Sequence, residues 1–409
     1  MSVPHKSLKQ CARHFTPAWF AAIMGTGAIS ILFHSFPYGQ GSQALQIFTY
    51  IFFFLNLALF IIFNAFSIAR YIIFPDVWSL MINHPAQSLF LGTYPMGAAT
   101  LINVAVGLIY EDYGFGGKPF LYALWAFWWL DVIISLFCAF VVVHVMKARQ
   151  KHALDKMTSI WLLPVVTLIV ASSSGGVIAP AMAEINPSYA LLTLTVSASL
   201  VFIGLGLAFM ILTTYLLRLI LYGVPAGPGV LSVFIPLGPM GQGGFSILLL
   251  GQGFRTALPL AYGDSPVLRL VAIGEIVDVV ALCVGMVLWA LATMWLIYAL
   301  LALYEVLRNT RFPFKQAFWG IIFPNGVYAN LTVQLSRTLD SQFFRIWGAI
   351  YSVATLVLWV AVFTRTATLV PHGAIFESPC VDEYDLQRAA ALAEKEKQAS
   401  QASGASTPV

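Results

Sequence analysis

Charged side chains are scarce in this sequence of 409 residues. Only 9% of the residues are Asp, Glu, Lys or Arg, whereas 59% are hydrophobic and the mean hydropathy is +0.84. So few polar residues could not cover the surface of a water-soluble globule of this length. The composition therefore excludes a soluble enzyme and predicts an integral membrane protein.

Motifs for cofactors and metals are also missing. The chain has no G-x-x-x-x-G-K-[ST] loop and no H-E-x-x-H motif, so neither ATP-driven transport by this chain nor zinc proteolysis is supported. Its four cysteines, Cys11, Cys138, Cys283 and Cys380, fall in two cytoplasmic segments and two apolar stretches, with neither a disulfide framework nor metal-ligand spacing. We expect free thiols, no cofactor and no metal. No basic run is interleaved with aromatics, so no nucleic-acid partner is expected.

Long apolar runs fill most of the chain. A bilayer core of roughly 30 Å needs about 20 mostly apolar residues in each helix. Ten stretches qualify, at 15–33, 45–73, 89–110, 121–146, 160–182, 190–221, 230–250, 267–303, 318–335 and 344–363. The sequence thus predicts an all-α protein with ten transmembrane helices in residues 15–364. Residues 1–14 and 365–409 form an N-terminal segment and a C-terminal tail.

The distribution of basic residues predicts the orientation. Of the 21 Lys and Arg, sixteen lie on the N-terminal side of the spans and five on the other. Cytoplasmic loops carry the excess of such residues, so we expect both termini in the cytoplasm. The end of the tail, 389–409, is rich in Ala, Ser, Lys and Glu and is expected to be disordered.

The odd-numbered spans share a pattern that the even-numbered spans lack. Each contains an interior or near-interior proline, namely Pro17, Pro95, Pro164, Pro236 with Pro239, and Pro324. Each also has a small-residue step near its middle, namely Met24-Gly25, Met96-Gly97, Ser174-Gly175, Met240-Gly241 and Asn325-Gly326. The glycines recur at intervals of 72, 78, 66 and 85 residues, so the ten spans read as five related helical hairpins.

Proline and glycine predict where these helices lie. They free backbone groups that lipid cannot satisfy, so broken helices belong where they face protein or a water-filled cavity. We expect kinked odd helices around a central pore and uniformly apolar even helices outside. In any single span, close helix packing explains the same residues.

The expected pore is neutral. Its candidate lining residues are Gly25, Thr26, Thr93, Gly97, Ser173, Ser174, Gly241, Gln242, Asn325 and Asn330. Helix N-termini attract anions. A ring of Asp or Glu would favour a cation, but the odd spans contain no such ring. The pattern indicates a path for a small anion.

Two acidic residues lie deep in even spans. Asp131 and Asp278 are each roughly 15 Å from the ends of their predicted helices, at about 1.5 Å per residue. An ionisable residue near the midplane is a candidate for proton coupling. An interhelical hydrogen bond is the structural alternative.

Several motifs carry a family resemblance. They are Phe15-Thr-Pro-Ala-Trp-Phe, Met24-Gly-Thr-Gly, Gly238-Pro-Met-Gly-Gln-Gly-Gly, and Trp319 to Phe323-Pro-Asn-Gly. Across roughly residues 13–365 the chain resembles the tellurite-resistance/dicarboxylate transporter superfamily, which includes plant slow anion channels, fungal malate permeases and fungal sulfite efflux pumps. The resemblance implies five hairpins around a central pore and assembly as a homotrimer.

The resemblance also implies a gate. In the anion-channel members a phenylalanine directly before a proline in the ninth helix plugs the pore, and this position matches Phe323 before Pro324. A large apolar ring in a narrow neutral pore can block it by size and by dewetting. Ordinary core packing of Phe323 is the alternative.

Within the superfamily, the seventh span resembles the sulfite exporters more than the malate permeases. Malate would favour an arginine clamp, and no odd-span interior holds an arginine. We therefore expect export of sulfite or bisulfite across a fungal plasma membrane. Proton-coupled transport of a C4-dicarboxylate such as malate, with Asp131 or Asp278 as the coupling acid, is the alternative. A membrane-embedded enzyme or a receptor has no supporting motif.

Overall fold

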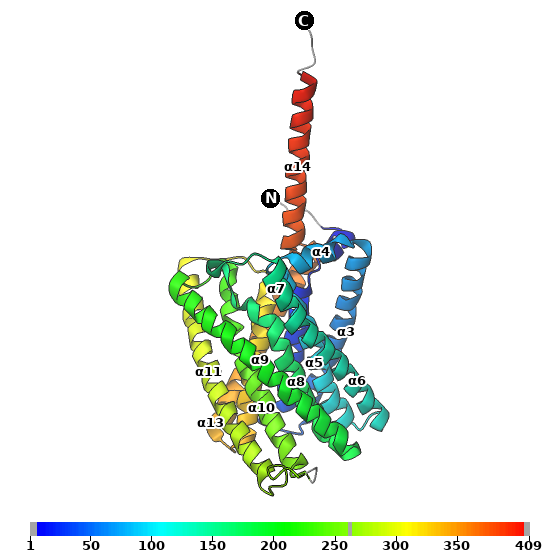
Figure 1. The fold of residues 1–409 in the computed structure, drawn as a ribbon, viewed down its shortest axis with the longest axis vertical. Coiled ribbons are helices and arrows are strands. Elements are labelled where there is room, and N and C mark those ends of the chain that lie inside the picture. Colours follow the sequence, from blue (N-terminus) through cyan, green and yellow to red (C-terminus); the bar gives the residue numbers. More distant parts are fainter. Residues whose placement is uncertain (1–5, 261–263, 405–409) are drawn as a thin grey trace.

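All regular elements that the structure describes are helices. It is a computed structural model that describes residues 6–260 and 264–404. Figure 1 shows a bundle of long helices in which both ends of the chain lie on the same side. The predicted all-α membrane class is confirmed.

Nine helical segments in the described part of the chain are long and apolar enough to cross a membrane. They are η1–α2 (Pro17–Trp19, Phe20–Ser35), α3 (Gln43–Ile73), η2–α5–η3 (Gln87–Gly92, Thr93–Val104, Ala105–Asp112), α6–η4–α7 (Gly117–Leu136, Phe137–Val142, Val143–Arg149), η6–α8 (Ser159–Leu162, Leu163–Ile185), α9 (Pro187–Tyr222), η7–α10 (Gly227–Phe234, Leu237–Ala257), α11 (Ile273–Asn309) and α13–η9 (Gln342–Leu369, Val370–His372).

The predicted ninth span, 318–335, is a tenth bundle helix of different composition. It consists of η8 (Gln316–Ile321) and α12 (Ile322–Thr338). It is not among the nine because its Asn, Gln, Ser and Thr side chains lower its hydropathy. Most of α12 is buried, so other helices shield these polar groups from lipid.

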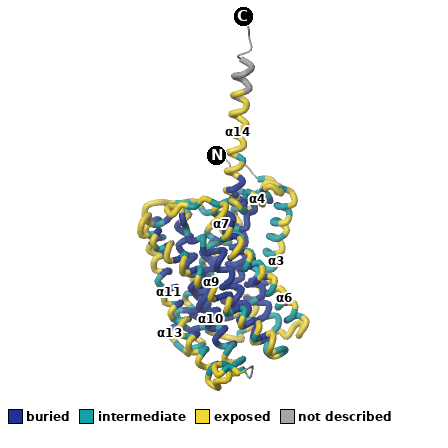
Figure 2. Tube along the Cα trace, viewed as in Figure 1, coloured by how far each residue is buried: buried dark blue, intermediate teal, exposed yellow. Residues whose placement is uncertain are grey.

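Burial divides the bundle into two sets of helices. In the most apolar windows of the spans containing α2, α5, α8 and α10, 67–94% of residues are buried, against 17–39% for the other five spans. Figure 2 shows the same division, with a buried centre and exposed outer faces. Helix α2 packs on α5, α5 on α8, α8 on α10, α10 on α12, and α12 again on α2. These five helices form a closed central ring.

Tryptophans of the outer helices hydrogen-bond to this ring. The indole of Trp359 in α13 donates to Thr26 Oγ1 at 3.1 Å, and the indole of Trp289 in α11 donates to Thr332 Oγ1 at 3.0 Å. The indole of Trp128 in α6 donates to the backbone oxygen of Ala171 at 2.8 Å. Buried polar groups of the ring are thus satisfied from outside it.

The sequence pattern placed the prolines of the odd spans in or near the helix interiors. In the structure these prolines lie at the beginning of the ring helices. Each ring helix starts with a 3₁₀ segment, and Pro95, Pro164, Pro239 and Pro324 occupy the second or third position of the α-helix that follows. Proline lacks only a backbone N–H that the first turn leaves unpaired in any case. Because alternate spans run in opposite directions, all five of these junctions lie towards the end of the bundle that carries the termini.

Glycines let the ring helices approach closely. A methyl group added at Gly241 would lie 2.9 Å from the backbone nitrogen of Tyr328, and one added at Gly92 would lie 2.5 Å from the backbone oxygen of Leu163. Methyl groups at Gly25 and Gly97 would lie 3.1 Å from isoleucine side chains of neighbouring ring helices. These glycines thus allow the helices of the ring to pack closely against one another.

Short helices cover the end with the termini. They are α1 (Leu8–Arg13), α4 (Asp76–Asn83) and η5 (Leu154–Lys156). The last helix, α14 (Pro379–Gly404), is 26 residues long. Helix α14 projects from the bundle (Figure 1), and its residues 386–396 are exposed. This differs from the disorder expected for 389–409, and the abundance of Ala, Glu and Lys, which are strong helix formers, gives the reason. Residues 405–409 lie outside the described part.

The contact at Gly92 gives a test of the ring packing. We expect Gly92→Ala to destabilise the protein by about 1–3 kcal/mol, because the added methyl group meets backbone that cannot rotate away. The measurement is the midpoint of thermal unfolding in detergent. Gly206→Ala is the matched control, since a methyl group there meets nothing within 4 Å and alanine favours the helix. Equal midpoints for the two variants would contradict this prediction.

Candidate anion path

Three cavities follow one another along the central ring. The inner cavity, at the end with the termini, has a volume of about 240 Å³; the middle cavity has about 40 Å³ and the outer cavity about 180 Å³. Ala21, Phe90, Ile235 and Gly320 line both the inner and the middle cavity. Phe323 lines both the middle and the outer cavity. The cavities therefore form one interrupted path, with Phe323 at one of the interruptions.

The outer cavity is lined by apolar side chains, with neutral polar ones among them and ionisable ones at its far end. Asn103, Gln242, Asn330 and Gln334 supply amide groups. The ionisable residues are His34, Glu111 and Arg337, and Arg337 donates a hydrogen bond to the backbone oxygen of Ser35 at 2.7 Å.

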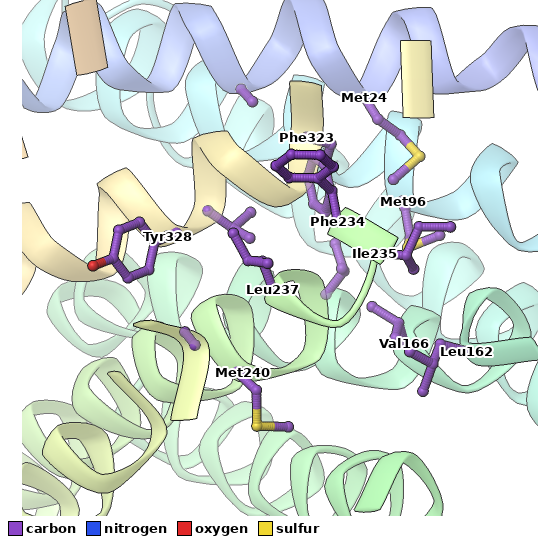
Figure 3. Close-up of a cluster of buried hydrophobic side chains, with 14 of the residues drawn as sticks. Met24, Met96, Leu162, Val166, Phe234, Ile235, Leu237, Met240, Phe323 and Tyr328 are labelled. Carbon is purple, nitrogen blue, oxygen red and sulfur yellow. The ribbon is translucent and has the colours of Figure 1, made fainter. Parts of the chain in front are cut away.

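The middle cavity is narrow and mostly apolar. Figure 3 shows the ring of Phe323 with Met24, Met96 and Ile235, which line the same cavity. A water molecule needs roughly 10–15 Å³ of such space, so the middle cavity holds only a few. The Phe323 ring thus lies in the wall of the smallest of the three cavities.

The first turns of all five ring α-helices surround the middle cavity. They contribute the lining residues Ala21, Thr93, Leu163, Gly238 and Phe323. Helix N-termini carry partial positive charge. This arrangement supplies an electrostatic preference for anions where the side chains themselves are neutral.

The 3₁₀ segments surround the inner cavity. Each of the five contributes to its wall, through residues that include Ala18, Gln87, Ile160, Ser232 and Gln316. Lys315, directly before η8, and Glu377, from the C-terminal tail, add one charge of each sign.

Five of the residues predicted for the gate and pore line this path. They are Phe323, Pro324, Thr93, Gln242 and Asn330. Gln242 donates through Nε2 to Ser173 Oγ, and Asn330 Oδ1 accepts a hydrogen bond from Ser35 Oγ at 3.3 Å. The structure thus brings two of the three predicted amides, those of Gln242 and Asn330, together on one side of Phe323.

The other predicted pore residues line none of the three cavities. Thr26 accepts the indole hydrogen bond of Trp359, and Asn325 Oδ1 accepts one from the Tyr351 hydroxyl at 2.5 Å. Ser173 and Ser174 donate to the backbone oxygen of Val170. Gly25, Gly97 and Gly241 are packing contacts. Their polarity or small size thus serves contacts between helices or, in the two serines, a hydrogen bond to the backbone of their own helix.

Sequence reasoning missed several residues of the path, namely Gln87, Glu111, Lys315, Gln334 and Arg337. On α12 the residue spacing could have shown them. One helix face carries Phe323, Val327, Asn330, Gln334 and Arg337, and all five line the outer cavity. The predicted span ended at residue 335, which left Arg337 outside it. The helix continues to Thr338.

Asp131 lies in the middle of α6, away from the path. It is 3% exposed, neither carboxylate oxygen has a hydrogen-bond partner among the described residues, and it lines none of the three cavities. The proposed interhelical hydrogen bond is therefore not made. A role in proton coupling stays a prediction.

Asp278 is much shallower than predicted. Residues 267–272 form turns, so α11 begins at Ile273 and Asp278 lies five residues, or about 7.5 Å, into it. Its carboxylate lies 3.3 Å from Arg255 Nη1. The midplane position was wrong because an apolar turn was read as helix.

Comparison with known proteins identifies the family. Residues 14–367 match the SLAC1 family, described as voltage-dependent anion channels. The chain belongs to this family. The sulfite efflux pump SSU1 of Trichophyton rubrum is 33% identical over 86% of this chain and 90% of its own length. The sulfite efflux pump SSU1 of Saccharomyces cerevisiae is 27% identical over 85% of each chain. The malic acid transport protein of Schizosaccharomyces pombe is 24% identical over 88% of this chain and 79% of its own.

These relatives agree with the predicted superfamily. They are channels and transporters and not enzymes, as the sequence predicted. The chain is a multi-pass membrane anion transporter of the SLAC1 family, and a small anion and the bilayer lipids are its partners.

Cysteine labelling tests which predicted residues face the path. We expect Asn330→Cys to react several times faster than the wild-type thiols with a membrane-impermeant thiol reagent added opposite the termini, because Asn330 lines the outer cavity. Thr26→Cys is the control and should not react above wild type, since Thr26 is fully buried against Trp359. Labelling is measured by mass shift. Equal labelling of the two variants would contradict the assignment.

Proposed function

We propose that this protein exports sulfite or bisulfite across the plasma membrane, with both termini in the cytoplasm and the inner cavity facing it. Two relatives named as sulfite efflux pumps cover most of the chain. The observation that carries the proposal is the interrupted path itself, in which amides and helix N-termini, rather than fixed charges, line the region on either side of Phe323.

The dimensions of the path favour a small oxyanion. The middle cavity of about 40 Å³ is surrounded by apolar side chains and five helix N-termini. Beyond it lie the amides of Gln242, Asn330 and Gln334. Gln242 and Gln334 each donate one hydrogen bond through Nε2, to Ser173 and Gln252, so each amide keeps a second N–H. A dicarboxylate would need two separated cationic contacts to hold both its ends. Arg337 is the one arginine among the lining residues of the three cavities.

Phe323 is the proposed gate. Its side chain is 4% exposed and lies between the middle and outer cavities. An apolar ring at a narrow point excludes water as well as the anion. Rotation of the ring away from the axis would join the two cavities. Pro324 follows it in the first turn of α12 and holds the backbone at this junction.

Assembly as a trimer is proposed from the resemblance to the superfamily. The exposed hydrophobic side chains of α3, α6, α9, α11 and α13 would then face lipid and neighbouring subunits.

Replacing the gate residue should open the path. We expect Phe323→Ala to raise sulfite flux in proteoliposomes about tenfold, the change that about 1.4 kcal/mol makes in a rate. Phe52→Ala is the matched control, because Phe52 is buried against Trp359 and lines none of the three cavities. Both variants remove a buried ring at a cost of about 3–5 kcal/mol of stability, so only the gate variant should gain flux. Unchanged flux from folded Phe323→Ala would argue for ordinary core packing.

The substrate is tested by comparing sulfite with malate under identical gradients in the same proteoliposomes. Sulfite flux well above malate flux is the expected result. Faster, pH-driven malate uptake would favour the dicarboxylate alternative, for which the unpartnered carboxyl group of Asp131 is the specific observation. In that case Asp131→Asn should abolish the pH dependence, and a retained pH dependence would exclude Asp131 as the coupling acid.

A further inference from the structure

The C-terminal segment 373–385 binds across the end of the bundle that carries the termini. Phe376 is buried, and its ring centroid lies 5.0 Å from that of Trp19. The fully buried Arg70 donates to the backbone oxygen of Phe15 at 2.6 Å and to Ser378 Oγ at 3.2 Å. The segment is thus anchored on residues that belong to the first and second spans.

Ion pairs further along the segment strengthen this attachment. Arg13 binds the carboxylate of Asp385 with two hydrogen bonds of 2.6 and 2.8 Å, and these hold the pKa of Asp385 below its usual range. His84 Nε2 lies 3.7 Å from Glu383 Oε1. Cys380 and Val381 pack on Val77 and Met81 of α4 in one buried cluster. The segment is therefore held by several separate contacts and not by one ion pair alone.

One residue of the segment reaches the anion path. Glu377 lies in the wall of the inner cavity, and its Oε2 is 2.8 Å from Lys315 Nζ. Among the described residues that line this cavity, Lys315 carries the one positive charge and Glu377 the one negative charge. The Glu377 carboxylate is thus paired with the one ammonium group in the cavity wall that could bind an incoming anion.

Two glutamines beside this pair have unpaired amide atoms. Gln316 Nε2 and Gln87 Oε1 are buried and have no hydrogen-bond partner among the described residues, although both side chains line the cavity. Gln87 is 7% exposed, and rotating its amide would exchange oxygen for N–H. Buried polar atoms without a partner call for a ligand or water. Amide N–H groups beside an ammonium group are the donors that an oxyanion binds.

We propose that Lys315, Gln316 and Gln87 form an entry site for a small oxyanion in the inner cavity, and that the Glu377 carboxylate occupies Lys315 until the anion displaces it. The inference rests on the proposed export through the central ring. Both partners of the Lys315–Glu377 pair are partly exposed, so the pair is weak and an anion at millimolar concentration can compete with it.

Opposite effects of two substitutions test the competition. Sulfite is supplied at fixed pH on the side of the termini, and flux is measured against its concentration. We expect Glu377→Gln to lower the half-saturating concentration and Lys315→Met to raise it, each about two- to fivefold, as for an exposed ion pair. The double variant should match Lys315→Met. If both single variants shift the value in the same direction, the pair is merely structural and the entry site is refuted.

Asp385→Asn is the matched control, because it removes the other strong ion pair of the same segment outside the cavity. We expect its half-saturating concentration to equal that of the wild type. If it reproduces the effect of Glu377→Gln, loosening of the segment and not the Glu377 carboxylate is responsible, and the proposal fails.

Binding measured without transport separates this inference from the proposed function. Sulfite that binds the folded protein raises its unfolding temperature in detergent. Glu377→Gln should reach half of this effect at a lower sulfite concentration than wild type, and Lys315→Met at a higher one. That order without sulfite flux would refute export but support the entry site. Sulfite flux without that order would refute the entry site alone.

Discussion

Close approach of helix backbones at glycine is the constraint on which the bundle depends. Where Gly241 meets Tyr328 and Gly92 meets Leu163, no side chain separates two ring helices. Association within a membrane relies on such packing because lipid is as apolar as the helices themselves. Five helices held this closely enclose a space narrow enough for the single ring of Phe323 to interrupt it.

A ring this tight also decides what its polar side chains do. Hydroxyl groups on the ring helices are satisfied by their own backbone, by the outer helices or by one another, as Ser174 is by Val170, Thr26 by Trp359 and Ser172 by Ser246. Buried polar groups require partners, and few of them are left to face the cavities. The outer cavity therefore depends on amides that project from one face of α12, on Gln242 of α10 and on Asn103 of α5.

Fixed charges are found at the two ends of the path and not at its centre. Arg337 and Glu111 lie at the outer end, and Lys315 and Glu377 at the inner end. At the centre an unpaired charge would carry a large desolvation cost and would bind an anion too tightly to release it. The partial charges of five helix N-termini attract anions there without that cost. In the proposed function, the ends would recruit the anion and the centre would select it by size.

The sequence by itself determined the membrane class, the helices and the special status of the odd-numbered spans, because hydropathy and proline and glycine content are local properties. Phe323, which was carried over by family motif, lines two of the three cavities, and its role as a gate stays a proposal. Only the tertiary structure decided which way the polar residues face and where α11 begins. It also decided that Glu377 pairs with Lys315, which lies 62 residues earlier in the chain. Those outcomes depend on neighbours distant in the chain. A hydroxyl in an apolar helix gives the same sequence signal whether it bonds a tryptophan behind it or faces a cavity.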